Sequence, residues 1–267
     1  MIARRLITPS LGIAAILLAG VTCANVGADG QPSSRPELTR QLHRGDAEGV
    51  ERALEAQSEP IALFFRAEAA ALRGRLVAAE SLFAAVPPAT SLGSLATARR
   101  AEIILARGDR AGAVTAAERV ASTLERQQPT DADGWLALGI AYQVLGSEVP
   151  AQFKDALVAY DRAAAADSSL LEVQLRLGQL FLDKYNAPDA RAAFTGVIRR
   201  DPGNAAAQLG LAQVALFEGR PDAQSLLLRA AAAGPGLGRT HGVLARLDLD
   251  AEAFDSAAGR AERAIGL

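Results

Sequence analysis

The two histidines are the first residues of this 267-residue sequence whose chemistry could support catalysis. An imidazole acts as a general base near neutral pH, but acyl transfer also needs a nucleophile. The single cysteine, Cys23, lies in a segment expected to be removed, and nothing indicates the buried Asp–His pair of a serine triad. His43 and His241 are also about 200 residues apart, which argues against a metal site built on imidazole. We therefore expect a chain without enzymatic activity, catalytic residues, metal or other cofactor.

Two other stretches contain residue types that are found in ligand sites. The acidic run at residues 248–255 lacks the turn glycine and the terminal glutamate of a calcium loop, so we expect it to form a polar turn. The glycines at 234, 236 and 238 follow no predicted strand and precede no Lys-Ser or Lys-Thr pair. They therefore do not indicate a phosphate-binding loop.

The composition favours closely packed helices. Half of the residues are hydrophobic, only 4% are aromatic, and alanine dominates the apolar fraction, which does not suit a sheet rich in Val, Ile and Tyr. The net charge is −2, so no overall basic field indicates nucleic acid as a partner. One cysteine excludes an intrachain disulfide framework.

The N-terminus has the pattern of an export signal. Arg4 and Arg5 precede an apolar run of 11 residues, Leu11 to Val21, whereas a helix that spans a membrane needs about 20. Small residues follow, so residues 1–24 are predicted to be a signal peptide, with two alternative cleavage sites, one after 22–24 and one after 26–28. Residues 25–36 are rich in Gly, Ser and Pro and are predicted to be a flexible linker.

Cys23 lies at the depth where a bacterial lipoprotein signal places its acylated cysteine. The three residues before it, Gly20 to Thr22, match a lipobox poorly. Two outcomes therefore stay open, namely release into the periplasm and a lipid anchor at Cys23 that would hold the protein at the outer membrane. Only the second would give the chain a contact with a membrane.

The organising pattern of the chain is Asp133–Tyr142. Trp135, Leu138 and Tyr142 are spaced at i, i+3 and i+7 and therefore share one face of a helix. Gly139 lies beside them, and its missing side chain would allow a second helix to approach closely. That second helix has small and large residues at matching positions, namely Ala156, Tyr160 and Ala163.

The same pattern returns with a period of 34 residues. Tyr160 and Phe194 are 34 apart, whereas Leu138 and Leu177 are 39 apart, so five extra residues lie between the two helices of the first unit. We place this insert at 146–153 and expect it to lengthen the turn between those helices. Weaker units extend the pattern in both directions, for about seven units in all.

The chain resembles tetratricopeptide repeat (TPR) proteins, because W-x2-L-G-x2-Y followed by A-x3-Y-x2-A is a signature of that family. The resemblance implies an all-α fold, a right-handed α-solenoid of about seven helix-turn-helix repeats over residues 37–267. It should be most regular over 132–267. Such proteins generally bind peptides or partner helices in a concave groove lined by the first helix of each repeat.

The repeat register predicts which residues line this groove. If Trp135, Leu138 and Tyr142 pack between helices, the other face of the same helix points toward the groove. We predict an apolar stripe flanked by glutamines, suited to a peptide with apolar anchors, and an arginine further along. The predicted groove residues are Leu136, Ile140, Gln143, Leu175, Gln179, Leu209, Gln213 and Arg246.

Function follows from this architecture by analogy only. The leading hypothesis is a non-enzymatic protein-binding scaffold of the bacterial cell envelope that serves pilus or secretion-system assembly, similar to the TPR lipoproteins of Tad/Flp pili. The alternative is a periplasmic chaperone or adaptor for cytochrome maturation or for cell-wall enzymes. Either way the partner is a protein or peptide.

Overall fold

The computed structural model describes residues 34–266, and every described residue lies in one unit of the chain, Ser33–Leu267. The predicted signal peptide, Cys23 and most of the predicted linker lie outside these residues. Fourteen α-helices follow one another: α1 (Arg35–His43), α2 (Ala47–Leu54), α3 (Pro60–Leu72), α4 (Leu76–Ala85), α5 (Gly93–Ala106), α6 (Arg110–Gln127), α7 (Ala132–Leu145), α8 (Gln152–Ala166), α9 (Leu171–Asp183), α10 (Ala187–Arg200), α11 (Ala205–Phe217), α12 (Ala223–Ala233), α13 (Gly238–Asp250) and α14 (Phe254–Gly266).

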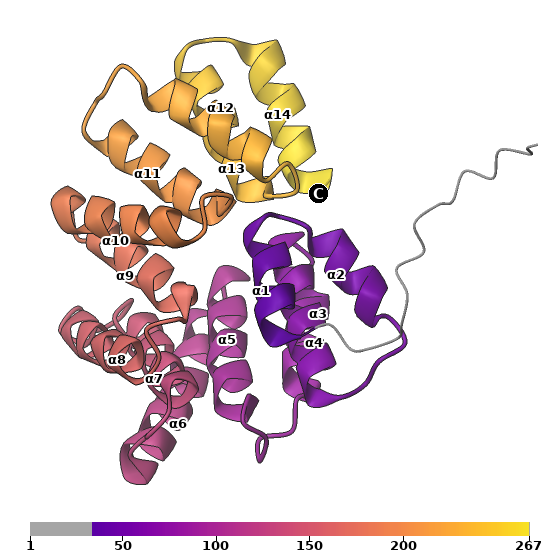
Figure 1. The fold of residues 1–267 in the computed structure, drawn as a ribbon, viewed down its shortest axis with the longest axis vertical. Helices are drawn as coiled ribbons and strands as arrows, with labels where there is room; N and C mark the ends of the chain where they lie inside the picture. Colours follow the sequence, from indigo (N-terminus) through magenta and orange to yellow (C-terminus); the bar gives the residue numbers. More distant parts are fainter. Residues whose placement is uncertain (1–33, 267) are drawn as a thin grey trace, which may run out of the picture. The chain divides into compact units, whose positions relative to one another are not determined.

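The helices form seven pairs, and the predicted α-solenoid is confirmed (Figure 1). Each odd-numbered helix packs against the even-numbered helix that follows it, and each pair contacts the next pair along the chain. No strand occurs between residues 34 and 266. None of the described helices is both long enough and apolar enough to cross a membrane.

Local sequence signals start many of these helices. The side chains of Asp46, Asp109 and Asp131 each accept a hydrogen bond from the backbone N–H three residues later, at the starts of α2, α6 and α7. Helix α1 begins at Arg35 with Pro36 in its first turn, where proline is well tolerated. The prediction that residues 35 and 36 belong to the linker is therefore wrong.

The insert at 146–153 lengthens one turn as predicted. Six residues separate the end of α7 at Leu145 from the start of α8 at Gln152, whereas three separate α9 from α10. The aromatic ring of Phe153 covers Gly146, so that a Cβ atom on Gly146 would lie 2.9 Å from the ring.

Glycine and aromatic pairs join the two helices of a repeat. Helix α7 passes so close to α8 that a Cβ atom on Gly139 would lie 2.4 Å from the ring of Tyr160, which is fully buried. In the next pair, a Cβ atom on Gly178 would lie 2.7 Å from the ring of Phe194. This is the close approach that the sequence pattern predicts.

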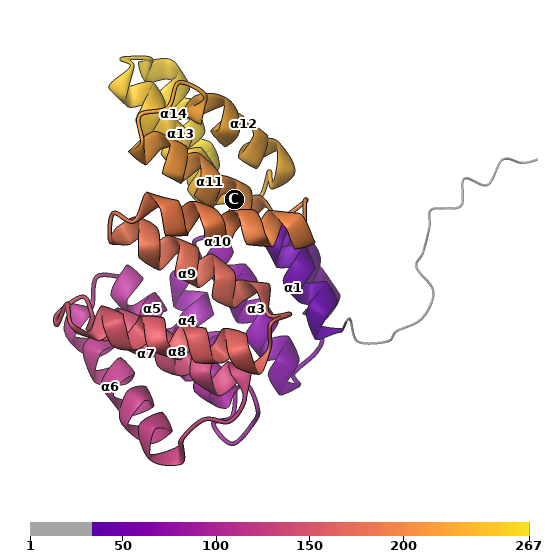
Figure 2. The same ribbon diagram turned by 60° about the vertical axis from the view of Figure 1, so that its left-hand side comes forward.

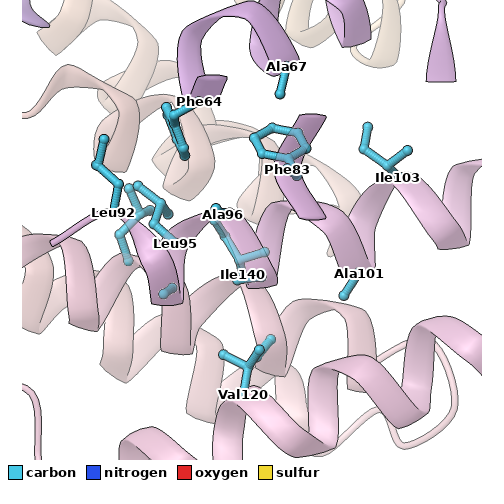
Figure 3. Close-up of a cluster of buried hydrophobic side chains, with 14 of the residues drawn as sticks. Phe64, Ala67, Phe83, Leu92, Leu95, Ala96, Ala101, Ile103, Val120 and Ile140 are labelled. Atoms are coloured by element: carbon cyan, nitrogen blue, oxygen red, sulfur yellow. The ribbon is translucent and has the colours of Figure 1, made fainter. Parts of the chain in front are cut away.

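The largest hydrophobic cluster extends from Leu38 to Leu180. Figure 3 shows its centre, where Phe64 and Phe83 lie near Leu95 and Ala96. The rings of Phe64 and Phe83 meet edge to face, with their centroids 5.6 Å apart. Beyond Leu180 the buried apolar residues form two smaller clusters, one around Phe194 and one around Leu227.

Candidate functional site

The first helices of the repeats line a partly open cavity of about 480 Å³. Every odd-numbered helix from α1 to α11 contributes to its wall, together with Leu237 and Arg239 at the start of α13. Apolar wall residues come from α1, α3, α5, α7, α9 and α11, and they include Leu42, Phe65, Leu95, Leu136, Leu175 and Leu209. Solvent, or a segment of another molecule, can therefore contact seven successive repeats at a single place.

Six of the eight residues predicted from the repeat register line this cavity. They are Leu136, Gln143, Leu175, Gln179, Leu209 and Gln213. Their role in binding a partner stays a prediction, because the structure contains the chain alone. Gln143 also accepts a hydrogen bond from the hydroxyl of Tyr160, at 2.6 Å, which links the cavity wall to the packing between α7 and α8.

The other two predicted residues lie elsewhere. Ile140 has no exposed surface and packs in the main core beside Ala96, because α7 turns this side toward α5 rather than toward the cavity (Figure 3). Arg246 lies beside Leu249 and Phe254 on a shallow surface groove between α13 and α14. The prediction that Ile140 faces the groove is therefore wrong, and Arg246 belongs to a different surface of the last repeat.

The floor of the cavity carries an ionic cluster that the sequence pattern did not predict. It contains three carboxylates and two guanidinium groups, from Glu68 of α3, Arg99 and Glu102 of α5, and Glu172 and Arg176 of α9. Their side chains are between 14% and 26% exposed, and all five line the cavity. The predicted apolar stripe is thus interrupted by charge.

Arg99 is the centre of this cluster. Its Nε atom lies 2.8 Å from a carboxylate oxygen of Glu68, and its Nη2 atom donates to Glu172 at 2.8 Å. Arg176 also donates to Glu172, at 2.9 Å, and makes two hydrogen bonds to Glu102. These bonds join α3, α5 and α9, which belong to three different repeats, and they hold the cavity wall in one arrangement.

Three carboxylates beside two guanidinium groups cannot all ionise easily in a partly buried place. Burial raises the pKa of Glu102, and the neighbouring carboxylates of Glu68 and Glu172 raise it further, while Arg99 opposes both effects. Burial likewise raises the pKa of Glu68. Burial also disfavours ionisation of Glu172, but Arg99 and His43 beside it hold the pKa of this carboxyl below its ordinary value.

The two histidines lie in different surroundings. His43 lines the cavity, and its Nε2 atom lies 3.5 Å from Glu172. His241 is buried in α13, where its Nε2 atom lies 3.1 Å from the carbonyl oxygen of Pro235. Within residues 34–266, no three His, Cys, Asp or Glu side chains are grouped so that they could hold a metal ion.

The sequence spacing indicates only the ion pairs of the cluster that lie within a single helix. Arg99 and Glu102 are spaced at i, i+3, and Glu172 and Arg176 at i, i+4, so each pair shares one helix face. The bonds that join α5 to α9 connect residues 73 or 74 positions apart. That connection depends on how the solenoid curls and leaves no local pattern.

A comparison with known families and structures agrees with this geometry. Residues 181–247 match the family described as tetratricopeptide repeat. The chain matches no protein among those with curated functions. Among solved structures it is similar to TTC0263, a thermophilic TPR protein of Thermus thermophilus, at 20% identity and a TM-score of 0.52, over 73% of this chain and 97% of that one.

Two further structures share less of the arrangement. One is the APC/C hetero-tetramer Cut9-Hcn1, at 13% identity and a TM-score of 0.49, over 86% of this chain and 45% of that one. The other is YrrB, described as a TPR protein with an unusual peptide-binding site, at 20% identity and a TM-score of 0.39, over 71% and 94% of the two chains. The repeat fold generally presents binding surfaces to other proteins rather than catalytic sites. Residues 181–247 thus match the tetratricopeptide repeat family, and the fold of the described residues is similar to that of a solved TPR protein.

Proposed function

We propose that this protein is a non-enzymatic scaffold of the bacterial cell envelope that binds a segment of a partner protein in its cavity. The observation that carries the proposal is the cavity itself, because one concave surface is formed by the first helices of seven successive repeats. An extended surface of this kind suits a chain segment better than it suits a small metabolite.

The lining favours a partner segment that offers both apolar side chains and hydrogen-bonding groups. Leu175 and Leu209 supply apolar contacts, while the amides of Gln179 and Gln213 can donate and accept hydrogen bonds. An extended peptide presents these two kinds of group in alternation along its backbone. The ionic cluster between α5 and α9 would favour polar partner groups at the centre of the cavity.

Photo-crosslinking in intact cells tests this binding site. A crosslinking amino acid at Leu175, which lines the cavity, is compared with one at Arg199, which is exposed on α10. We expect a specific partner to be captured from position 175 and not from position 199. Capture from position 199 alone would contradict the proposal.

The proposed location rests on the N-terminal sequence, which lies outside the described residues. A basic start, an apolar run of 11 residues and Cys23 suit export, followed by either release into the periplasm or lipid anchoring. Labelling cells with palmitate distinguishes these outcomes. Incorporation that disappears in Cys23→Ser supports the anchor, and incorporation that is unchanged in this variant contradicts it.

Within the envelope, we propose pilus or secretion-system assembly as the process. Support comes only from the architecture, a TPR array behind an export signal. Mass spectrometry of the protein captured from Leu175 tests it directly. A pilin or secretin would support the assignment, and a haem-handling or cell-wall enzyme would contradict it.

A further inference from the structure

Helix α1 and the turn that follows it make contacts that a simple repeat array does not contain. In a solenoid each repeat contacts only its neighbours. Here Arg35, the first residue of α1, forms two parallel hydrogen bonds of 2.6 and 2.5 Å to Asp133 at the start of α7. His43, the last residue of α1, lies 3.5 Å from Glu172 of α9. The first repeat thus reaches across the cavity to the fourth and fifth repeats.

The turn between α1 and α2 reaches further, to the sixth and seventh repeats. Its backbone touches the turn between α12 and α13 so closely that a Cβ atom on Gly236 would lie 2.1 Å from the carbonyl oxygen of Gly45. Arg44, in the same turn, lies 3.8 Å from Asp201 at the end of α10. Figures 1 and 2 both show α1, in indigo, beside the orange helices of the C-terminal half.

These contacts are weak compared with the packing inside the repeats. Arg35 is 35% exposed and Arg44 is 58% exposed, and ion pairs this open to water contribute little stability. The apolar residues of α1, Leu38 and Leu42, belong instead to the main hydrophobic cluster. Neither apolar cluster of the C-terminal repeats contains a residue of α1 or α2. Separating the α1–α2 turn from α10 and from the α12–α13 turn would therefore not disrupt either of these two clusters.

The closed arrangement restricts what can occupy the cavity. Thr39, Leu42 and His43 of α1 form part of its wall. These residues of α1 lie opposite wall residues of α9 and α11, such as Leu175 and Leu209. Moving α1 away from the C-terminal repeats would therefore widen the cavity for a partner segment.

We propose that α1 and the α1–α2 turn form a clasp that holds the solenoid curled and limits access to the cavity. In the closed state the clasp contacts α7, α9, α10 and the α12–α13 turn. When these contacts separate, the repeats that follow α10 move away from α1 and the cavity opens at its C-terminal end, while the ionic cluster still joins α5 to α9. The limit on partner binding rests on the proposed function, whereas the opening itself is a property of the chain alone.

Distance measurements between two spin labels test the clasp on the full chain without a partner. Labels are placed at Arg40 of α1 and Arg229 of α12, which are both exposed, in a Cys23→Ser background. The test variant is Gly236→Ala, whose added methyl group must push the two turns apart. Its matched control is Gly242→Ala in α13, where an added Cβ atom has no neighbour within 4 Å. Asp133→Asn removes the ion pair to Arg35 independently of the glycines.

We expect Gly236→Ala to shift most of the distance distribution to longer values, Asp133→Asn to add a longer population, and Gly242→Ala to match the parent. An unchanged distribution in both Gly236→Ala and Asp133→Asn would overturn the clasp. Opening should also raise the crosslinking yield from Leu175 severalfold. If the labels show opening but position 175 captures nothing, the binding proposal fails and the clasp stands. If position 175 captures a partner but the distances never change, the clasp fails and the binding site stands.

Discussion

Helices α7 and α9, the first helices of the fourth and fifth repeats, each have two faces with different roles. One face of α7 and α9 presents Gly139 and Gly178 to the rings of Tyr160 and Phe194, and this contact closes each repeat. The opposite face turns toward the cavity and presents amides and leucines, together with Glu172 and Arg176 of α9, which belong to the ionic cluster. The first face determines the fold, and we infer that the second determines what the protein binds. Four changes test this division, ordered from the largest expected effect to the smallest.

Arg99→Met should cause the largest loss of stability. The substitution removes the guanidinium group that pairs with Glu68 and Glu172. Glu68 is then left without an ion-pair partner in a partly buried place, whereas Glu172 keeps Arg176. We expect the free energy of unfolding to fall by about 3 kcal/mol, measured by urea denaturation. Arg119→Met, on the exposed face of α6, is the control and should change it by less than about 0.5 kcal/mol. Equal effects of the two variants would show that the ionic cluster does not support the fold.

Gly139→Ala should test the packing face alone. A methyl group at this position would lie 2.4 Å from the fully buried ring of Tyr160, so α7 and α8 must move apart. The expected loss is about 2 kcal/mol in the same denaturation experiment.

Gly196→Ala is the matched control for that change. Gly196 lies in α10 with no atom near the added methyl group, and alanine is the better helix former. We expect a gain of about 0.5 kcal/mol, because the helix interior then loses less backbone entropy on folding. A loss similar to that of Gly139→Ala would mean that the close approach of α7 and α8 is not what makes glycine necessary.

The pH dependence of stability should report on the cavity face. The folded state raises the pKa of Glu68 and Glu102 above the ordinary value of 4.5, so it binds more protons than the unfolded chain. Stability contributed by these two groups is therefore fully present below about pH 4.5 and declines as the pH rises above it. Glu172 acts in the opposite sense, because the pKa of its carboxyl is lowered. The stability that Glu172 contributes is fully present above about pH 4.5 and is lost as the pH falls through the lowered pKa of this carboxyl.

Glu102→Gln should therefore flatten the decline of unfolding free energy between pH 5 and pH 8, by on the order of 2 kcal/mol. Urea titrations at several pH values measure this slope. Glu48→Gln, at an exposed pair with Arg52, should leave the slope as it is in the parent. If the unfolding free energy of the parent chain rises steadily from pH 5 to pH 8, the raised pKa values of Glu68 and Glu102 are contradicted.

Asp133→Asn should have the smallest effect on stability. Its partner Arg35 is 35% exposed, and a pair of this kind contributes less than about 1 kcal/mol. Thermal unfolding followed by circular dichroism should therefore barely change. A large loss would show that the contact between α1 and α7 is part of the core and cannot open as a clasp.

The sequence predicted the packing face well because its signals are local. Trp135, Gly139 and Tyr160 lie within one helix pair, and their spacing sets the register of both helices. The cavity face was predicted only in part. The register placed Leu175 and Gln213 on the cavity wall, but it misplaced Ile140, because the side of α7 that packs on α5 is close to the side that faces the cavity.

Features that depend on the curl of the solenoid left no comparable signal. The bonds from Arg176 to Glu102, and from Arg35 to Asp133, join residues 74 and 98 positions apart. Their partners come together only because small rotations between successive repeats accumulate in one direction. The ionic cluster and the clasp therefore become visible only in the folded chain.

The central claim, that the cavity face binds the partner while the packing face maintains the fold, is tested most directly by filling the cavity. Ala206 lines the cavity from α11, and Ala192 is exposed on α10. With the crosslinker at Leu175, Ala206→Trp should abolish capture of the partner while Ala192→Trp preserves it, and both variants should unfold within about 1 kcal/mol of the parent. Capture that survives Ala206→Trp in a folded protein would contradict the account.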